Sequence, residues 1–264
     1  MMLPDLKSIH VNREKEVALL LEMIRGTRQA HILLIKADGG IGKSSLLREF
    51  WRHGQETQRV SSIDLKGLDG SWTVLGKLAD QLGREYFEHF DSKSAEFAST
   101  GGVTIDRSTL VGTQVKANVA PIDLEQRKMR SQLLAKAFFE DLDAMHTRYS
   151  QGMLFLFDTF DQAVPEVQEW LGGTFLNWVR RYRWLVTVIV GRSIPEREIS
   201  WEELCLIHPL GSLDRDYVRE YVQRVELSLS EEEIGVIYDI TDGNPLDLAT
   251  NIGRLLAKRG AING

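Results

Sequence analysis

A glycine-rich turn between an apolar segment and a helix-like segment constrains this chain more than any other feature. Residues 32–36 read Ile-Leu-Leu-Ile-Lys, a run of branched side chains that is typical of a buried strand. The turn after it reads Ala-Asp-Gly-Gly-Ile-Gly and ends in Lys43 and Ser44. Apolar residues then recur at helical spacing, at Leu46, Leu47 and Phe50. A strand, a glycine-rich turn and a helix that begins with Gly-Lys-Ser form the setting that a phosphate-binding loop requires.

The chemistry of this turn predicts a nucleotide site. Glycines let the backbone curl until successive N–H groups point inward, and the helix N-terminus adds further donors and its positive dipole end. We expect Lys43 to reach the β- and γ-phosphates and Ser44 to offer its hydroxyl to Mg²⁺. The first position of the pattern G-x-x-x-x-G-K-[ST] is Ala37, which the backbone tolerates if φ there is negative. The loop residues expected to bind nucleotide are Asp38, Gly39, Gly40, Ile41, Gly42, Lys43, Ser44 and Ser45.

Length and composition fit a cytoplasmic globular protein. The chain has 264 residues, which suits one large α/β domain or a core domain with a smaller one. A formal net charge of −6 disfavours a general binder of nucleic acid or of anionic membranes. Cys205 is the only cysteine, so an intrachain disulfide cannot form and a reducing compartment is natural. No segment of the sequence has the length and apolar character of a membrane span or of a secretion signal.

Apolar segments predict an α/β fold with a five-stranded, mostly parallel sheet. The expected strands are residues 32–36, 60–65, 153–157, 184–190 and 204–207. The expected helices of this part are residues 12–25, 43–53, 72–90, 124–149 and 169–181. Because helical or loop crossovers separate the strands, we expect helices on both faces of the sheet. Residues 91–123 are rich in Ser, Thr, Gly and Asn, and we interpret them as a protruding loop or marginal hairpin inserted in this domain.

The C-terminal part of the chain reads as a small helical domain. After Pro209 the strand patterns stop and three helical patterns follow. Asp214 is placed to cap the first, Ser230 begins a capping box ahead of the second, and Pro245 lies near the start of the third. We therefore predict a nucleotide-binding domain over residues 1–208 and a helical lid over residues 209–264.

Charged residues at strand ends complete the expected site. Asp158 ends a buried strand that we expect beside the phosphate strand, where it can hold Mg²⁺ together with Ser44; the alternative is a simple turn acid. Asp161 can orient or deprotonate the attacking water, or else cap a turn or helix. Arg192 follows the fourth strand and can stabilise charge on the γ-phosphate, unless it only pairs with a nearby surface glutamate. The candidate catalytic residues are thus Lys43, Asp158, Asp161 and Arg192.

Several short motifs accompany the phosphate loop in a characteristic order. They are Val11-Asn12-Arg13-Glu14, Asp158-Thr159-Phe160-Asp161, Gly191-Arg192, His208-Pro209-Leu210 and Gly243-Asn244-Pro245-Leu246. Together they resemble the STAND class of P-loop ATPases, which are related to NACHT and NB-ARC switch domains. The entry motif of that class is usually Val-Gly-Arg-Glu, and Asn12 replaces its glycine. A typical AAA+ motor has Glu directly after the first acid, and Thr159 occupies that position here.

The resemblance implies an ATP-binding, slowly hydrolysing switch. It implies that adenine lies between the entry motif (Val11, Asn12 and Arg13) and Pro245 of the Gly-x-Pro motif, with Pro209 in the linker to the lid. ATP or ADP with Mg²⁺ would set the lid angle and so control self-association or docking to effector or sensor domains. The family's winged-helix, repeat-sensor and effector parts are not in the sequence, so we expect a module excised from such a protein or one that works with separate chains.

Three other functions remain open from the sequence. The first is an AAA+ or origin-recognition-like ATPase that acts on DNA, which Thr159 and the acidic charge disfavour. The second is a scaffold that binds nucleotide without turnover. The third is a small-molecule kinase, against which the lid motifs argue.

Overall fold

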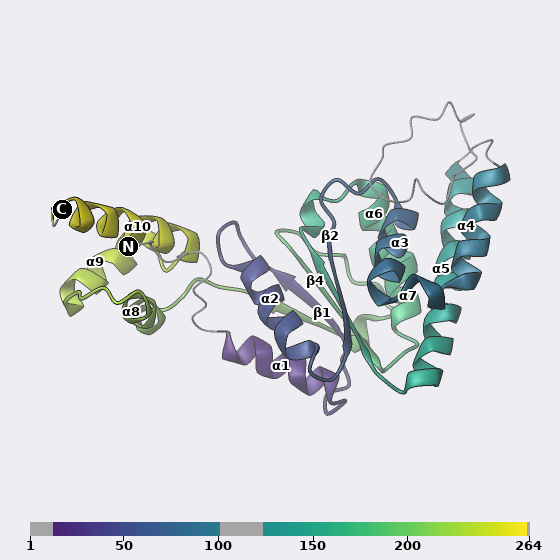
Figure 1. Ribbon diagram of the computed structural model, residues 1–264, viewed down its shortest axis with the longest axis horizontal. Coiled ribbons are helices and arrows are strands. Elements are labelled where there is room, and N and C mark those ends of the chain that lie inside the picture. The colour runs from purple at the N-terminus through teal and green to yellow at the C-terminus, as the bar shows by residue number, and fades with distance from the viewer. Residues whose placement is uncertain (1–12, 101–123, 263–264) are drawn as a thin grey trace.

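The computed structural model describes residues 13–100 and 124–262, and a five-stranded sheet forms its centre (Figure 1). Its strands are β1 (Ile32–Lys36), β2 (Arg59–Asp64), β3 (Met153–Asp158), β4 (Leu185–Gly191) and β5 (Cys205–Pro209). They lie in the order β2-β3-β4-β1-β5, and every neighbouring pair is parallel. The expected parallel α/β sheet is therefore confirmed, and the carboxyl ends of all strands meet at one edge.

Helices cover both faces of the sheet because the central strands β1, β3 and β4 are apolar and buried on both sides. Leu33 and Ile35 share one core with α1 (Glu14–Ile24) and α2 (Lys43–Gly54). Ile32 and Leu34 belong to a larger core on the opposite face. The helices of that face are α3 (Ser71–Leu82), α4 (Glu88–Thr100), α5 (Leu124–Tyr149), α6 (Pro165–Trp170) and α7 (Leu176–Val179).

The order of the strands corrects one expectation. Strand β4 lies between β1 and β3, so the strand that ends in Asp158 is not the neighbour of the phosphate strand. Hydrophobicity could not reveal this, because any of these fully apolar strands can occupy a central position. Asp158 still lies at the same carboxyl edge, since β3 runs parallel to the others.

The predicted helix over residues 72–90 is wrong in its extent. It is broken at Gly83, where φ is 107°, into α3, the 3₁₀ turn η1 (Arg84–Tyr86) and α4. Residues 91–100, expected to begin a loop, continue α4 instead. Phe90 stacks edge-on against Phe138 of α5, and its N–H donates to Asp141 at 2.9 Å. These contacts with α5 stabilise a helix that its polar composition did not suggest, and residues 101–123 lie outside the described residues.

The helix expected over residues 169–181 is also interrupted. A π-helical turn, η4 (Leu171–Phe175), separates α6 from α7. Gly172 and Gly173 disfavour a regular helix here, and the indole N–H of Trp201 donates to the Gly172 carbonyl at 2.9 Å. The remaining short turns are η3 (Phe160–Gln162) and η5 (Glu202–Leu204).

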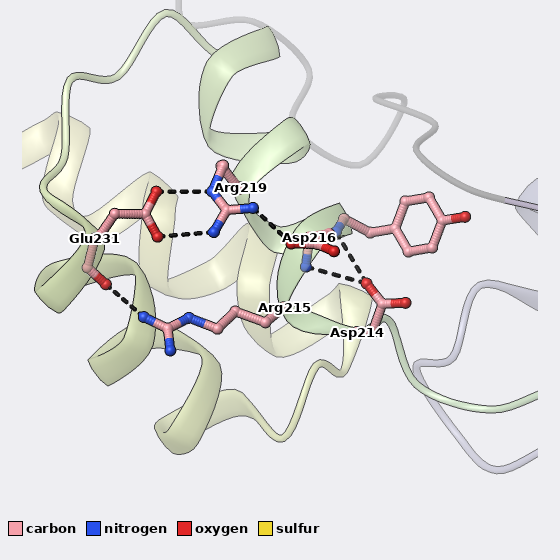
Figure 2. A network of polar contacts seen from close by, with 6 residues as sticks. Asp214, Arg215, Asp216, Arg219 and Glu231 are labelled. Carbon is pink, nitrogen blue, oxygen red and sulfur yellow. Dashed lines mark hydrogen bonds and ion pairs between the residues drawn. The ribbon is translucent and has the colours of Figure 1, made fainter.

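Three C-terminal helices form a separate cluster around their own core. They are α8 (Arg215–Arg224), α9 (Glu231–Thr241) and α10 (Pro245–Ile262), packed through Leu213, Val218, Tyr221, Ile234, Ile237, Leu248 and Ile252 among others. Asp214 accepts hydrogen bonds from the N–H groups of Asp216 and Tyr217, and Ser230 and Glu233 form the expected capping box. Figure 2 shows Arg219 of α8 bound to Asp216 and to the carboxylate of Glu231. The domain boundary at residue 209 stays a prediction.

Candidate functional site

The glycine loop joins β1 to α2 in the conformation that its sequence requires. Gly40 and Gly42 have φ of 81° and 93°, values that a side chain would strain. Ala37, the departure from the usual glycine, does not have a positive φ, and its N–H donates to the Gly191 carbonyl at 3.0 Å. Alanine is therefore compatible with this loop because its first residue needs no special backbone conformation.

Lys43 begins α2 and folds back over the loop. Its ammonium donates to the Ala37 carbonyl at 2.9 Å and to the carbonyl of Asp38. Burial lowers its pKa, while Asp161 acts in the opposite direction. The side chain thus provides a partly desolvated cation at the mouth of the loop, where negative charge would stabilise its protonated form.

Ser44 and Asp158 lie together although 114 residues separate them. The Ser44 hydroxyl donates to the Asp158 carboxylate at 2.5 Å. The other Asp158 oxygen accepts from the N–H of Thr159 at 2.7 Å, and Thr159 is left-handed with φ of 54°. The Thr159 hydroxyl donates in turn to Asp64, which ends β2 opposite Asp158. A hydroxyl and a carboxylate are hard oxygen donors, so this pair has the chemistry to hold Mg²⁺ with waters in its other positions.

Asp161 and Arg192 meet at the ends of β3 and β4. One Asp161 oxygen accepts the backbone N–H of Arg192 at 2.8 Å. The Arg192 guanidinium covers Gly39 so closely that a Cβ built there would lie 3.2 Å from a guanidinium nitrogen. The Arg192 guanidinium therefore lies over the glycine loop, and its role there stays a prediction.

Arg13 connects the loop to the C-terminal segment. It is buried, and one guanidinium nitrogen donates to the Ile41 and Gly211 carbonyls, each at 2.9 Å. Glu16 lies 3.8 Å from Arg13 and 3.1 Å from His208 Nε2. Desolvation lowers the pKa of Arg13, and Glu16 opposes this effect. Residues far apart in sequence are thus held beside the glycine loop by one cation.

A cleft of about 450 Å³ lies over the glycine loop, within the size range of small-molecule sites. The predicted site residues that line it are Arg13, Gly39, Gly40, Ile41, Gly42, Lys43, Ser44, Ser45, Asp161, Arg192 and Pro245. The C-terminal helices and the segment just before α8 add an apolar wall of Leu213, Tyr221, Leu246 and Ala249. A larger hollow of about 610 Å³ lies around α5 and α7, but it includes no residue of the loop.

Some predicted site residues are not brought to the cleft. Pro209 ends β5 opposite Lys36 and is exposed, and the side chain of Asp38 is exposed as well. Neither lines the cleft. Asp158 lies just behind it, in contact with Ser44. Val11 and Asn12 lie outside the described residues, so their expected contact with adenine stays a prediction.

The structure adds residues that sequence reasoning missed. Arg48 lines the cleft, and its guanidinium donates to the Ser45 hydroxyl at 3.0 Å. Its position one helical turn after Ser45 was a readable signal, because residues three apart share a helix face. Thr159 and Gln162 also line the cleft. Asn244 donates to the Gly39 carbonyl at 3.2 Å, a contact across 205 residues that no local pattern indicates.

Within residues 13–100 and 124–262, no group of three or more His, Cys, Asp or Glu side chains is arranged to hold a metal ion. Across those residues, no helix combines the length and the apolar character needed to cross a membrane.

No protein-family model and no curated protein matches this chain. Solved structures resemble it in fold. A Signal Transduction ATPase with Numerous Domains (STAND) protein with a tetratricopeptide repeat sensor, from Pyrococcus horikoshii, has a TM-score of 0.52 and 18% identity over 91% of this chain and 29% of its own. Cdc6p from Pyrobaculum aerophilum has a TM-score of 0.50 and 16% identity over 94% of this chain and 59% of its own.

A chain of the HORMA:CdnC:Trip13 complex of E. coli MS115-1 is also similar, with a TM-score of 0.50 and 10% identity over 88% of this chain and 74% of its own. Our chain thus spans less than a third of the STAND protein and about three fifths of Cdc6p. At these identities the likeness concerns the fold alone. The fold is that of the P-loop ATPases.

Proposed function

We propose that this protein is a STAND-type switch module that binds ATP with Mg²⁺ and hydrolyses it slowly. The observation that carries the proposal is the cleft itself. On one side lie a phosphate loop, its lysine and an acid–arginine pair, and on the other lies an apolar wall from the C-terminal helices. A polyphosphate with an aromatic base matches both chemistries. The NACHT and NB-ARC relationship belongs to this proposal and rests on the motifs.

The triphosphate lies along the loop in this proposal. Backbone N–H groups of the glycine turn and the start of α2 bind its oxygens, and Lys43 bridges the β- and γ-phosphates. Ser44 and Asp158 hold the Mg²⁺, which neutralises charge on the phosphates when bound. The 2.5 Å contact between these two side chains supports their shared role.

The adenine lies between Arg13 and the wall that includes Pro245. Apolar and aromatic lining supplies most of the burial for a base, with few polar groups to orient it. Tyr221 and Ala249 are buried residues of that wall and belong to different helices. Because one wall comes from residues 209–264, we assign these residues as a lid whose position depends on the nucleotide.

Slow hydrolysis follows from the groups at the γ-phosphate end. Asp161 is the acceptor we assign to the attacking water, and Arg192 stabilises charge on the γ-phosphate. One Asp161 oxygen already accepts a backbone N–H, and Thr159 stands where an AAA+ motor has its glutamate. A change of lid angle would then govern self-association or docking to effector or sensor chains in the cytoplasm.

The second candidate is an AAA+ or origin-recognition-like ATPase that acts on DNA, because the fold that this chain shares with Cdc6p does not separate it from the switch. The net charge of −6 argues against it. Fluorescence anisotropy with duplex DNA at 50 and 200 mM salt separates the two. The switch predicts no binding, whereas affinity that falls steeply with salt would favour the DNA-acting ATPase.

The bound small molecule is the first thing to identify. Purified protein should retain an adenine nucleotide, with ADP more abundant than ATP, because a ligand enclosed between two walls escapes slowly. Mass spectrometry of the supernatant after denaturation identifies it. A guanine nucleotide would overturn the assignment to adenine.

Lys43→Ala tests the loop directly. It should abolish ATP binding in calorimetry because it removes a positioned cation from the phosphates. Lys36→Ala is the matched control, since Lys36 is an exposed lysine at the end of β1 and does not line the cleft. If folded Lys43→Ala protein bound ATP as tightly as the control, the phosphate site would be wrong.

A further inference from the structure

The turn that precedes α10 contacts the glycine loop through hydrogen bonds. The side-chain amide of Asn244 donates to the Gly39 carbonyl at 3.2 Å, and the N–H of Leu246 donates to the Gly40 carbonyl, also at 3.2 Å. Two consecutive carbonyls of the loop are therefore bound by the C-terminal helical region. These contacts link residues about 200 positions apart in the sequence.

Asn244 has two separate tasks in this contact. Its side-chain oxygen accepts from the N–H groups of Leu246 and Asp247, at 3.0 and 3.4 Å, and so caps the start of α10. Its side-chain nitrogen is the donor to Gly39. The same amide thus caps the start of α10 and also binds the glycine loop. Only the second task requires a donor, which allows the two to be separated by substitution.

Close packing keeps this turn in place. The Leu213 N–H donates to the Gly243 carbonyl at 2.8 Å, and Gly243 has φ of 63°. A Cβ built on Gly243 would lie 1.9 Å from the Leu213 carbonyl oxygen. On the other side, a Cβ built on Gly40 would lie 2.7 Å from the side-chain oxygen of Asn244. The turn approaches the glycine loop this closely because Gly40 has no Cβ, and it approaches Leu213 this closely because Gly243 has none.

Binding of the carbonyls affects the opposite side of each peptide. In a trans peptide the C=O and the following N–H point in opposite directions within one plane. Holding the Gly39 and Gly40 carbonyls toward this turn therefore directs the N–H groups of Gly40 and Ile41 away from it. A carbonyl that accepts a hydrogen bond also polarises its peptide, which makes the N–H a stronger donor.

We propose that Asn244 is a positioning residue, through which the C-terminal helical region orients the N–H donors of the glycine loop before an anion binds. The inference rests on the proposed role of the loop as a phosphate site. It assigns Asn244 no contact with the nucleotide. It also gives a physical link between the lid and phosphate affinity, because movement of the turn would release both carbonyls.

Asn244→Ser isolates the link. Serine is a good N-cap, so α10 keeps its start, but the hydroxyl is too short to reach Gly39. The substitution adds no charge near the phosphates. Asn251→Ser is the matched control, because the Asn251 amide lies on the same helix and donates to the Asp247 carbonyl of its own helix.

Two measurements follow, both on the full chain. In the nucleotide-free protein, the hydrogen–deuterium exchange rate of peptides covering residues 39–42 should rise about threefold to tenfold in Asn244→Ser. This factor corresponds to the net free energy of one hydrogen bond. Peptides from α10 should stay protected. Affinity for ATP and for inorganic tripolyphosphate should fall by the same factor, about threefold to tenfold. The control should change neither.

The outcomes separate the inference from the proposed function. The inference would be overturned if Asn244→Ser had the exchange rate and both affinities of the wild type. It would also be overturned if the variant lost affinity for ATP but not for tripolyphosphate, because Asn244 would then be a residue that contacts the nucleoside. If the wild-type protein bound neither ATP nor tripolyphosphate, the proposed function would fail, and the exchange measurement would still test whether Asn244 orders the loop. If α10 lost protection in the variant, Asn244→Asp, which also keeps the cap, replaces it in the exchange measurement.

Discussion

At the scale of single residues, the site is built from polar groups that already have partners inside the protein. The Lys43 ammonium donates to two loop carbonyls, and Ser44 donates to Asp158. These contacts hold the two side chains in position, and in the proposed function a phosphate oxygen or a metal ion would replace them. Because burial lowers the pKa of Lys43, a bound polyphosphate should raise it again and binding should weaken as the pH rises through the free-state pKa.

Asp161→Asn should separate binding from turnover. Asparagine keeps an oxygen that can accept the Arg192 N–H, so the loop geometry survives. We expect ATP affinity close to wild type and kcat reduced about a hundredfold or more, as for loss of a general base. Calorimetry and a phosphate-release assay measure the two quantities. A parallel fall in affinity and rate would make Asp161 a binding or folding residue.

Cys205 should react slowly in the native protein. Burial raises the pKa of its thiol to about 11. At pH 8 this leaves about a hundredfold less thiolate than an ordinary cysteine has. The rate with Ellman's reagent should therefore rise by about that factor when the protein is unfolded in urea. Because Cys205 is the only cysteine, equal native and unfolded rates would show that the thiol is accessible and ordinary.

At the scale of elements, helix starts depend on caps, whereas the ion pairs of the C-terminal helices contribute less. Ser230 and Glu233 satisfy each other's backbone donors at the start of α9. The Arg219 contacts with Asp216 and Glu231 lie at the surface, where solvent and salt screen them (Figure 2). Local stability of this region therefore comes from caps and from its apolar core.

Ser230→Ala should destabilise the C-terminal helices. Loss of an N-cap costs about 1 kcal/mol of folding free energy. Urea unfolding followed by circular dichroism measures the change. Ser212→Ala, at an exposed serine outside any helix, is the control and should be neutral. A Ser230→Ala midpoint equal to that of Ser212→Ala would mean that the packing of α9 alone determines its start.

At the scale of the whole molecule, the cleft exists only because two regions of the chain meet. The apolar wall of Leu213, Tyr221 and Ala249 comes from the C-terminal helices and the segment before α8, which share their own core. Arg13, Asn244 and Leu246 each donate a hydrogen bond to a carbonyl of the glycine loop. A site between two regions can be changed by moving one relative to the other, as a switch requires.

Turnover by this chain alone should be slow. The groups assigned to the water and the γ-phosphate are few, so kcat should lie well below the ~10 s⁻¹ median of enzymes. Phosphate release at saturating ATP and Mg²⁺ measures it. Rapid turnover without retained nucleotide would instead indicate a motor.

The sequence by itself determined the features that depend on neighbouring residues. The glycine loop, the caps at Asp214 and Ser230, and the long helix over residues 124–149 could be predicted, because each depends on neighbouring residues and the backbone they allow. The Ser44–Asp158 contact could also be anticipated, since strand-end acids of a parallel sheet share one edge.

Long-range packing decided the rest. The place of β4 between β1 and β3, the extension of α4 against α5, and the contacts of Arg13 and Asn244 with the loop depend on groups distant in the sequence. The sequence of an apolar strand does not specify which strands lie beside it, and a marginal helix forms wherever a partner surface buries it. The strand order, the extent of α4 and these contacts depend on the total burial and hydrogen bonding of the folded chain. Therefore only the tertiary structure could reveal them.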